Sequence, residues 1–312
     1  MRSAALDLSL PVLLGTAWFS AADESAADAS ITAYLDAGGH VLDTARIYGD
    51  SESVIGGWLR ANGEVPGLQL LTKGAHPDPA DWLSRLGRDA VLADARTSIE
   101  KLGRPVDAYL LHRDDGTTPV EEVADTLRAV VDEGLTSAVG VSNWGLERTR
   151  GLRTALRARD LELAAVSDYI GLALPSAEPD WAGEASLTAP LLAWLEEEGV
   201  PNLSWSSQSS GYFVGVAGGH QFDGDENVRR RAVLEEIAAL AGVRPESVLA
   251  RWSATLSPVV VPVLASRSPE RLARTIADTR DASLDPVVAN LVAALDPNGT
   301  LGRPLIEPGA VW

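Results

Sequence analysis

The sequence predicts an α/β protein, a (β/α)8 (TIM) barrel in which residues 1–312 form a single domain. Eight short apolar runs alternate with segments whose apolar residues recur at helical spacing. This alternation continues over roughly 250–300 residues, the usual size of such a barrel, and no change in composition marks a linker. A doubly wound open sheet is the structural alternative, but its Gly-x-Gly-x-x-Gly fingerprint does not follow the first strand.

The predicted strands are continuous apolar runs, at residues 10–16, 40–43, 68–72, 106–111, 136–141, 163–166, 202–205 and 259–264. The predicted helices have apolar residues on one face and cover residues 28–38, 51–61, 89–102, 120–133, 146–159, 188–198, 226–241, 245–253 and 269–279. An extra helix at residues 285–295 and a Gly/Pro-rich tail ending at Trp312 complete the chain.

Composition excludes several classes of function. With 26 Lys and Arg against 44 Asp and Glu, the net charge of −18 makes nucleic acid and anionic membranes poor partners for the surface as a whole. A few arginines and backbone N–H groups can still bind an anionic cofactor. The absence of cysteine rules out disulfides, thiolate nucleophiles and Cys-ligated zinc, and the four histidines lack ligand spacing, so no metal site is expected.

No targeting or membrane-spanning segment is expected from the residue pattern. The first eight residues lack the uncharged apolar run of a signal peptide, and no stretch approaches ~18 continuous apolar residues. We therefore expect a cytoplasmic protein that acts on a small molecule.

Reactive side chains follow three consecutive predicted strands. Asp43 and Tyr48 follow the second strand, Lys73 the third and His112 the fourth. In a barrel these strand ends meet at one mouth. An ammonium beside a phenol, whose pKa is ordinarily near ~10, favours the phenolate, and a carboxylate keeps that ammonium charged. With an imidazole donor, the set suits protonation of a carbonyl oxygen as hydride reaches its carbon.

Each of these residues also has a purely structural interpretation. His112 alone would be a buried core histidine, Lys73 could extend from a strand end to solvent, and Asp43 could cap a helix. Their coincidence on consecutive strands favours a shared site. Because the chain has only two lysines, a lysine at the end of a buried strand is also unusual.

The motifs around these residues resemble those of the aldo-keto reductase superfamily, over nearly the whole chain. They are Asp-Thr-Ala-x-x-Tyr-Gly at residues 43–49 with Ser51, Glu52 and Gly56, Leu-Thr-Lys at 71–73, Leu-Leu-His at 110–112, and Gly-Val-Ser-Asn-Trp at 140–144. The resemblance implies an NAD(P)H-dependent carbonyl reductase with Tyr48 as general acid. Asp43 and Lys73 would tune the acid, and His112 would orient the carbonyl. Residues 167–174 and 205–213 resemble bacterial members of undefined substrate.

The resemblance also implies cofactor contacts. Ser142 and Asn143 match the pair that holds the nicotinamide carboxamide, and the loop at 205–211 matches the segment that reaches the pyrophosphate. Ser266 and Arg267 match the site of the adenosine 2′-phosphate, so NADPH is expected over NADH. The expected cofactor contacts are Ser142, Asn143, Tyr169, Ser206, Ser207, Gln208, Gly211, Ser266, Arg267 and Arg271.

The sixth strand departs from the family pattern. Where many members have a Gln near the nicotinamide amide, this chain has Ser167 and Asp168, one of which would replace that contact. Tyr169 remains a candidate to stack on the nicotinamide ring.

Aromatic residues are expected to line the substrate pocket: Trp18, Trp82, Trp144 and Tyr212, with Trp181 and Trp312 as further candidates. Such walls suit hydrophobic carbonyls and also stack on sugar rings. The segment Arg113-Asp114-Asp115 would either orient substrate hydroxyls or cap the next helix.

Two other functions are compatible with the same residues. Some barrels of this superfamily are cofactor-sensing regulatory subunits with slow catalysis and a protein partner, although no long docking extension is visible here. A Schiff-base aldolase would use Lys73 as a nucleophile, but that chemistry needs a neutral amine, and Asp43 favours a charged one.

Overall fold

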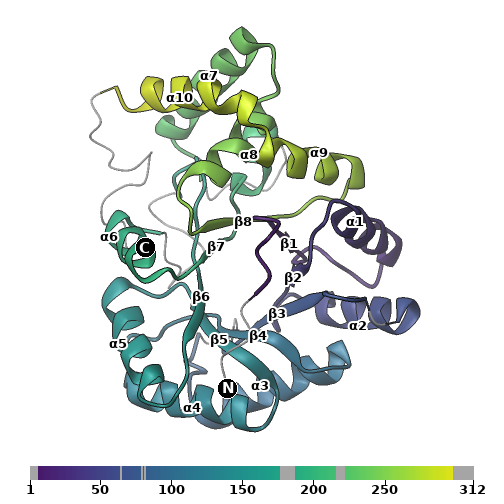
Figure 1. The fold of residues 1–312 in the computed structure, drawn as a ribbon, viewed down its shortest axis with the longest axis vertical. Helices are drawn as coiled ribbons and strands as arrows, with labels where there is room; N and C mark the ends of the chain where they lie inside the picture. Colours follow the sequence, from purple (N-terminus) through teal and green to yellow (C-terminus); the bar gives the residue numbers. More distant parts are fainter. Residues whose placement is uncertain are drawn as a thin grey trace.

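The computed structural model describes residues 6–63, 65–78, 80, 82–175, 187–215 and 222–297. Eight parallel strands form a closed barrel in sequence order, and the last strand pairs back to the first. Helices surround this ring on all sides (Figure 1). The closed ring confirms the predicted (β/α)8 barrel and excludes the open sheet.

The strands coincide with the predicted apolar runs and are β1 (Leu13–Gly15), β2 (Val41–Asp43), β3 (Gln69–Gly74), β4 (Val106–Leu111), β5 (Thr136–Ser142), β6 (Leu163–Ser167), β7 (Asn202–Ser204) and β8 (Val260–Leu264). The helices are α1 (Glu24–Asp36), α2 (Ser51–Asn62), α3 (Arg88–Leu102), α4 (Val120–Asp132), α5 (Leu146–Arg157), α6 (Ala189–Glu198), α7 (Asp225–Ala241), α8 (Pro245–Thr255), α9 (Pro269–Arg280) and α10 (Asp285–Leu295). Two 3₁₀ segments, η1 (Ser209–Val214) and η3 (Ala282–Leu284), were not predicted.

One helix boundary differs clearly from the sequence pattern. α1 begins at Glu24, four residues before the predicted start, because Asp23 accepts a hydrogen bond from the backbone N–H of Ala26 and caps the helix. The expected C-terminal helix is present as α10, and it lies against α7 outside the ring (Figure 1). The expected tail lies outside the described residues.

Two hydrophobic cores divide the side chains of each strand by alternation. The inner core fills the barrel and includes Val41, Leu71 and Leu110, while the intervening residues pack outward against the helices. Two residues beyond these inner positions stand Asp43, Lys73 and His112. The side-chain period of two therefore directs all three toward the barrel mouth.

The described part of the chain contains no helix that is both long enough and apolar enough to cross a membrane.

Candidate active site

A cavity of about 820 Å³ opens at the carboxyl ends of the strands. The four predicted catalytic residues line it together: Asp43, Tyr48, Lys73 and His112. Nine of the ten expected cofactor residues also line it: Ser142, Asn143, Ser206, Ser207, Gln208, Gly211, Ser266, Arg267 and Arg271. These residues follow the ends of six strands, β2 to β5, β7 and β8, and they converge on one cavity.

A buried ion pair forms the base of the cavity. Lys73 Nζ lies 2.5 Å from Asp43 Oδ1 and donates a second hydrogen bond, 3.2 Å long, to the carbonyl oxygen of Thr44. Burial alone would lower the pKa of Lys73, but Asp43 and the oxygen of Tyr48 raise it above its ordinary value. Lys73 is therefore an ammonium at neutral pH, so it does not fit a Schiff-base nucleophile, which needs a neutral amine.

Tyr48 lies in the loop after β2, half-buried above this pair. Lys73 Nζ is 5.4 Å from the centroid of the Tyr48 ring. The ring of His112 approaches edge-on, with centroids 5.7 Å apart. The phenol thus stands between an ammonium and an imidazole, which is the arrangement a proton donor to a carbonyl oxygen needs.

His112 is buried and electrically neutral. Burial lowers its pKa well below the usual range, and the charges of Lys73 and Arg113 and the proximity of His76 lower it further. A neutral imidazole carries one N–H, so His112 can donate a hydrogen bond to a substrate oxygen while the ring itself is uncharged.

A hydroxyl network supports the base of the cavity from behind. Thr16 Oγ1 donates to the carbonyl oxygen of Asp43, and the Ser51 hydroxyl lies 2.7 Å from Thr16 Oγ1 and 2.8 Å from Thr44 Oγ1. Behind β3, Thr72 donates to the buried carboxylate of Glu52. The first turn of α2 thereby anchors the ends of β1, β2 and β3, which keeps Asp43 and Lys73 in register.

The end of β5 presents polar atoms to the cavity. Asn143 has a left-handed backbone, with φ of 62°. Its side chain donates to the carbonyl oxygen of His112 and to Ser142 Oγ. Ser142 gives its only hydroxyl hydrogen to the carbonyl oxygen of Ser167. The remaining lone pair on Ser142 Oγ is an acceptor, which suits the amide N–H₂ of a nicotinamide.

The structure places Trp205, and not Tyr169, at the cavity wall. Tyr169 is buried behind it, donates its hydroxyl hydrogen to the carbonyl oxygen of Ala173 and stacks on Phe222. Trp205 lies two residues beyond the inner-core Leu203 and packs on Tyr169 at 5.1 Å. The sequence signal for a position at the cavity wall was an aromatic residue in the inward register at the end of β7.

Neither Ser167 nor Asp168 lines the cavity. Ser167 Oγ donates to the carbonyl oxygen of Leu203, and Asp168 Oδ1 accepts the backbone N–H of Asn143 at 2.9 Å. Asp168 therefore holds the left-handed turn that carries Asn143. The expected replacement of the Gln contact by one of these two residues stays a prediction.

The four expected pocket aromatics occupy different places. Trp18 lines the cavity, and the guanidinium carbon of Arg267 lies 5.6 Å from its ring. Trp82 is 47% exposed and stands outside the cavity wall, against His76. Tyr212 packs on Phe222 and Arg231 instead of lining the cavity. Trp181 and Trp312 lie outside the described residues.

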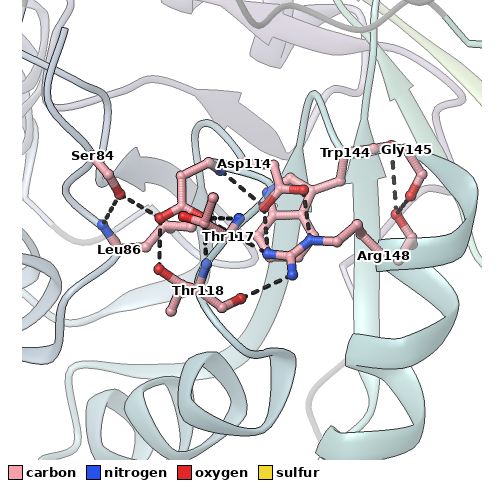
Figure 2. A network of polar contacts seen from close by, with 10 residues as sticks. Ser84, Leu86, Asp114, Thr117, Thr118, Trp144, Gly145 and Arg148 are labelled. Atoms are coloured by element: carbon pink, nitrogen blue, oxygen red, sulfur yellow. Dashed lines mark hydrogen bonds and ion pairs between the residues drawn. The ribbon is translucent and has the colours of Figure 1, made fainter.

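Trp144 is fully buried beneath Arg148 and is not a wall of the cavity (Figure 2). Arg148 binds both carboxylate oxygens of Asp114 and the carbonyl oxygen of Thr118. Asp115 accepts hydrogen bonds from Ser84 and Thr118, which hold the turn before α4. Both carboxylates are thus structural, whereas the preceding Arg113 lines the cavity.

Further cavity residues went unassigned in the sequence: His76 after β3, Ile47 beside Tyr48, and Phe213 and Val214 in η1. Ile47 and His76 follow predicted strand ends by a few residues, which is a weak signal. The η1 residues follow no regular pattern, so no local signal identifies them. Within the described residues, no group of three or more His, Asp or Glu side chains is arranged to hold a metal ion.

The (β/α)8 barrel and the residues gathered at its strand ends indicate the class of protein. Comparisons with known proteins identify the family. The model of the aldo/keto reductase family matches residues 11–296. The chain belongs to the aldo/keto reductase family. It is an oxidoreductase that acts on carbonyl or alcohol groups of small molecules with a nicotinamide cofactor.

Several relatives are similar in sequence over much of the chain. A 6-dehydroglucose reductase of Agrobacterium fabrum is 31% identical over 272 residues, which cover 82% of this chain and 83% of that protein. The aldo-keto reductase YhdN of Bacillus subtilis is 25% identical over 68% of this chain and 61% of its own length. The mouse aflatoxin B1 aldehyde reductase member 2 is 28% identical over 67% of this chain and 54% of its own length.

Proposed function

We propose that the protein is an NADPH-dependent carbonyl reductase in which Tyr48 gives its phenolic proton to the carbonyl oxygen. The observation that carries the proposal is the buried ammonium of Lys73, held by Asp43 at 2.5 Å and lying 5.4 Å from the Tyr48 ring. Substrates would be aldehydes, ketones or keto-sugars, because the relatives include a 6-dehydroglucose reductase and an aflatoxin B1 aldehyde reductase.

Proton transfer falls to Tyr48. A bound nicotinamide cofactor would supply the hydride for the carbonyl carbon, and the carbonyl oxygen would then need a proton. A phenol is a weak acid, but the Lys73 ammonium stabilises the phenolate left behind. Asp43 keeps Lys73 charged although both side chains are buried. Tyr48 recovers its proton from solvent through the open cavity.

His112 would orient the carbonyl. Its depressed pKa keeps the ring neutral, so its single N–H is a hydrogen-bond donor and not a competing acid. With Tyr48 on one side and His112 on the other, a carbonyl oxygen would accept two hydrogen bonds. Both bonds strengthen as negative charge develops on the oxygen, which lowers the barrier to hydride transfer.

The cavity residues fit a dinucleotide. Ser142 and Asn143 would hold the carboxamide, Trp205 would stack on the nicotinamide ring, and the backbone of the loop after β7 would meet the pyrophosphate. Arg267 and Arg271 stand at the start of α9, whose N-terminus also favours anions. Two guanidinium groups there suit a 2′-phosphate, so NADPH is proposed over NADH.

The test is NADPH oxidation against a panel of aldehydes, ketones and keto-sugars. Replacing Tyr48 by Phe should lower kcat on the order of 10²–10⁴-fold, because the proton donor is lost. NADPH affinity, measured by fluorescence titration, should stay near wild type. Tyr212→Phe, outside the cavity, is the control and should keep full activity. A Tyr48→Phe variant with near-normal kcat would reject Tyr48 as the acid.

One relative, from rice, is named as a probable voltage-gated potassium channel subunit beta and is 27% identical over 62% of this chain. A regulatory barrel that binds the same cofactor would retain the same four residues. The panel of carbonyl substrates separates the two functions. Negligible turnover of every carbonyl by the wild-type protein would reject the proposed reductase function.

A further inference from the structure

A second imidazole stands next to the catalytic histidine. His76 follows β3 by two residues, is half-buried and lines the cavity. Its ring meets the ring of His112 edge-on with centroids 5.0 Å apart, and His112 in turn lies 5.7 Å from Tyr48. His76 is therefore one ring beyond the place where a carbonyl oxygen would bind.

The hydrogen bonds of His76 define its tautomer. Its Nδ1 lies 2.8 Å from the carbonyl oxygen of Pro77. A carbonyl oxygen can only accept, so Nδ1 carries the hydrogen and Nε2 carries a lone pair. Burial lowers the pKa of His76, and the charge of Arg113 lowers it further, so the ring is neutral at neutral pH. Among the described residues no hydrogen bond reaches Nε2, which leaves an acceptor at the cavity wall.

Arg113 is the neighbour of His112 in sequence and also lines the cavity, with 6% of its surface exposed. A guanidinium is a hydrogen-bond donor and never an acceptor. His76 and Arg113 therefore contribute one acceptor group and one donor group to the cavity lining, and the charge of Arg113 acts on both His76 and His112. A hydroxyl is the group that uses both, because it donates one hydrogen bond and accepts others.

Another part of the cavity wall is apolar. Ile47, Phe213 and Val214 line the same cavity with apolar or aromatic surface. A polyhydroxylated carbonyl compound has both faces in one molecule, since its C–H groups pack on apolar or aromatic surface while its hydroxyls form hydrogen bonds.

We infer that the substrate is a hydroxylated carbonyl compound of the sugar-aldehyde or keto-sugar class, and that His76 Nε2 accepts a hydrogen bond from a hydroxyl within two carbons of its carbonyl. The inference rests on the proposed function for the position of the carbonyl. It assigns to His76 a role in substrate selection that the four catalytic residues do not provide.

The test compares three-carbon substrates that differ only in their hydroxyls, glyceraldehyde and propanal. The wild-type kcat/KM for glyceraldehyde should exceed that for propanal by about tenfold or more. His76→Leu should remove most of that preference, bringing the ratio of the two kcat/KM values close to one. His76→Gln, whose amide oxygen is an acceptor, should restore part of the preference. Equal preference in wild type and His76→Leu would overturn the inference.

A binding measurement separates this inference from the proposed function, because it needs no turnover. Glycerol and 1-propanol are titrated into the protein with NADP⁺ present, and tryptophan fluorescence reports binding. Glycerol should bind more tightly to wild type, and His76→Leu should abolish the difference. If the wild-type protein reduces no carbonyl, the proposed function fails, while equal binding of the two alcohols overturns the inference whatever the turnover.

Discussion

Two buried carboxylates of this barrel differ in charge state. Asp43 faces the Lys73 ammonium and forms an ion pair. Asp168 instead accepts the backbone N–H of Asn143 and has no exposed surface. Burial raises the pKa of Asp168 to about 8, although hydrogen bonds from the backbone of Asn143 and Trp144 oppose the shift. Asp168 is therefore largely protonated in the folded protein at neutral pH.

This charge state predicts a pH dependence of stability. The unfolded protein releases the Asp168 proton near pH ~4, whereas the folded protein keeps it to about 8, so the folded state binds more protons in between. The free energy of unfolding should therefore fall as pH rises through this window. Between pH 6 and pH 8, wild type should lose about 2 kcal/mol relative to Asp168→Asn. Urea unfolding at both pH values measures this, and parallel profiles would contradict it.

Packing between helices depends on one glycine of α2. A Cβ at Gly56 would lie 2.0 Å from the carbonyl oxygen of Lys101, at the end of α3. Backbone cannot move aside as a flexible side chain can. The helix that carries Ser51 and Glu52 therefore approaches α3 only because residue 56 has no side chain, and that approach places the hydroxyl network beneath the active site.

The two adjacent glycines of α2 provide a matched pair of variants. Gly56→Ala should destabilise the protein by about 2–4 kcal/mol through overpacking and displacement of α2. Gly57→Ala meets only the flexible end of Arg60, at 3.8 Å, and should be neutral or stabilising by up to about 1 kcal/mol, because Ala favours a helix. Chemical denaturation compares the two. Equal effects would show that the close contact with Lys101 does not limit packing.

The molecule as a whole is strongly acidic, yet one end of its cavity is basic. The net charge is −18, while Arg267 and Arg271 both line the cavity at the start of α9. Local guanidinium groups and the helix N-terminus act at a few ångströms, where the surrounding surface charge is largely screened. An anionic cofactor can therefore bind to a protein that repels anions overall.

Cofactor binding should stabilise the whole fold. At 100 times its Kd, a ligand contributes about 2.7 kcal/mol, so NADP⁺ should raise the Tm by several degrees, and NAD⁺ at the same concentration should raise it less. Arg267→Ala should reduce the difference between the two cofactors. Arg274→Ala is the control, because Arg274 is exposed on the same helix and does not line the cavity. Equal shifts by both cofactors in wild type would reject the proposed NADPH preference.

The barrel and the convergence of the four proposed catalytic residues on one cavity were predictable from the sequence because both depend on local patterns. The alternation of strands and helices can be predicted from the spacing of apolar residues along the chain. The two-residue period of a strand places Asp43, Lys73 and His112 in the same inward register as Val41, Leu71 and Leu110. Closure of the ring was inferred from the number of repeats, and the pairing of β8 with β1 confirms it.

Tertiary structure alone decided which side chains reach the cavity beyond those strand ends. Trp205 lines the wall while Tyr169 lies behind it, and Trp144 is sealed under Arg148. His76 stands beside His112 although 36 residues separate them in the chain. The physical reason is that a loop residue has no fixed period: its direction depends on packing against segments distant in sequence, and so does the burial that shifts its pKa.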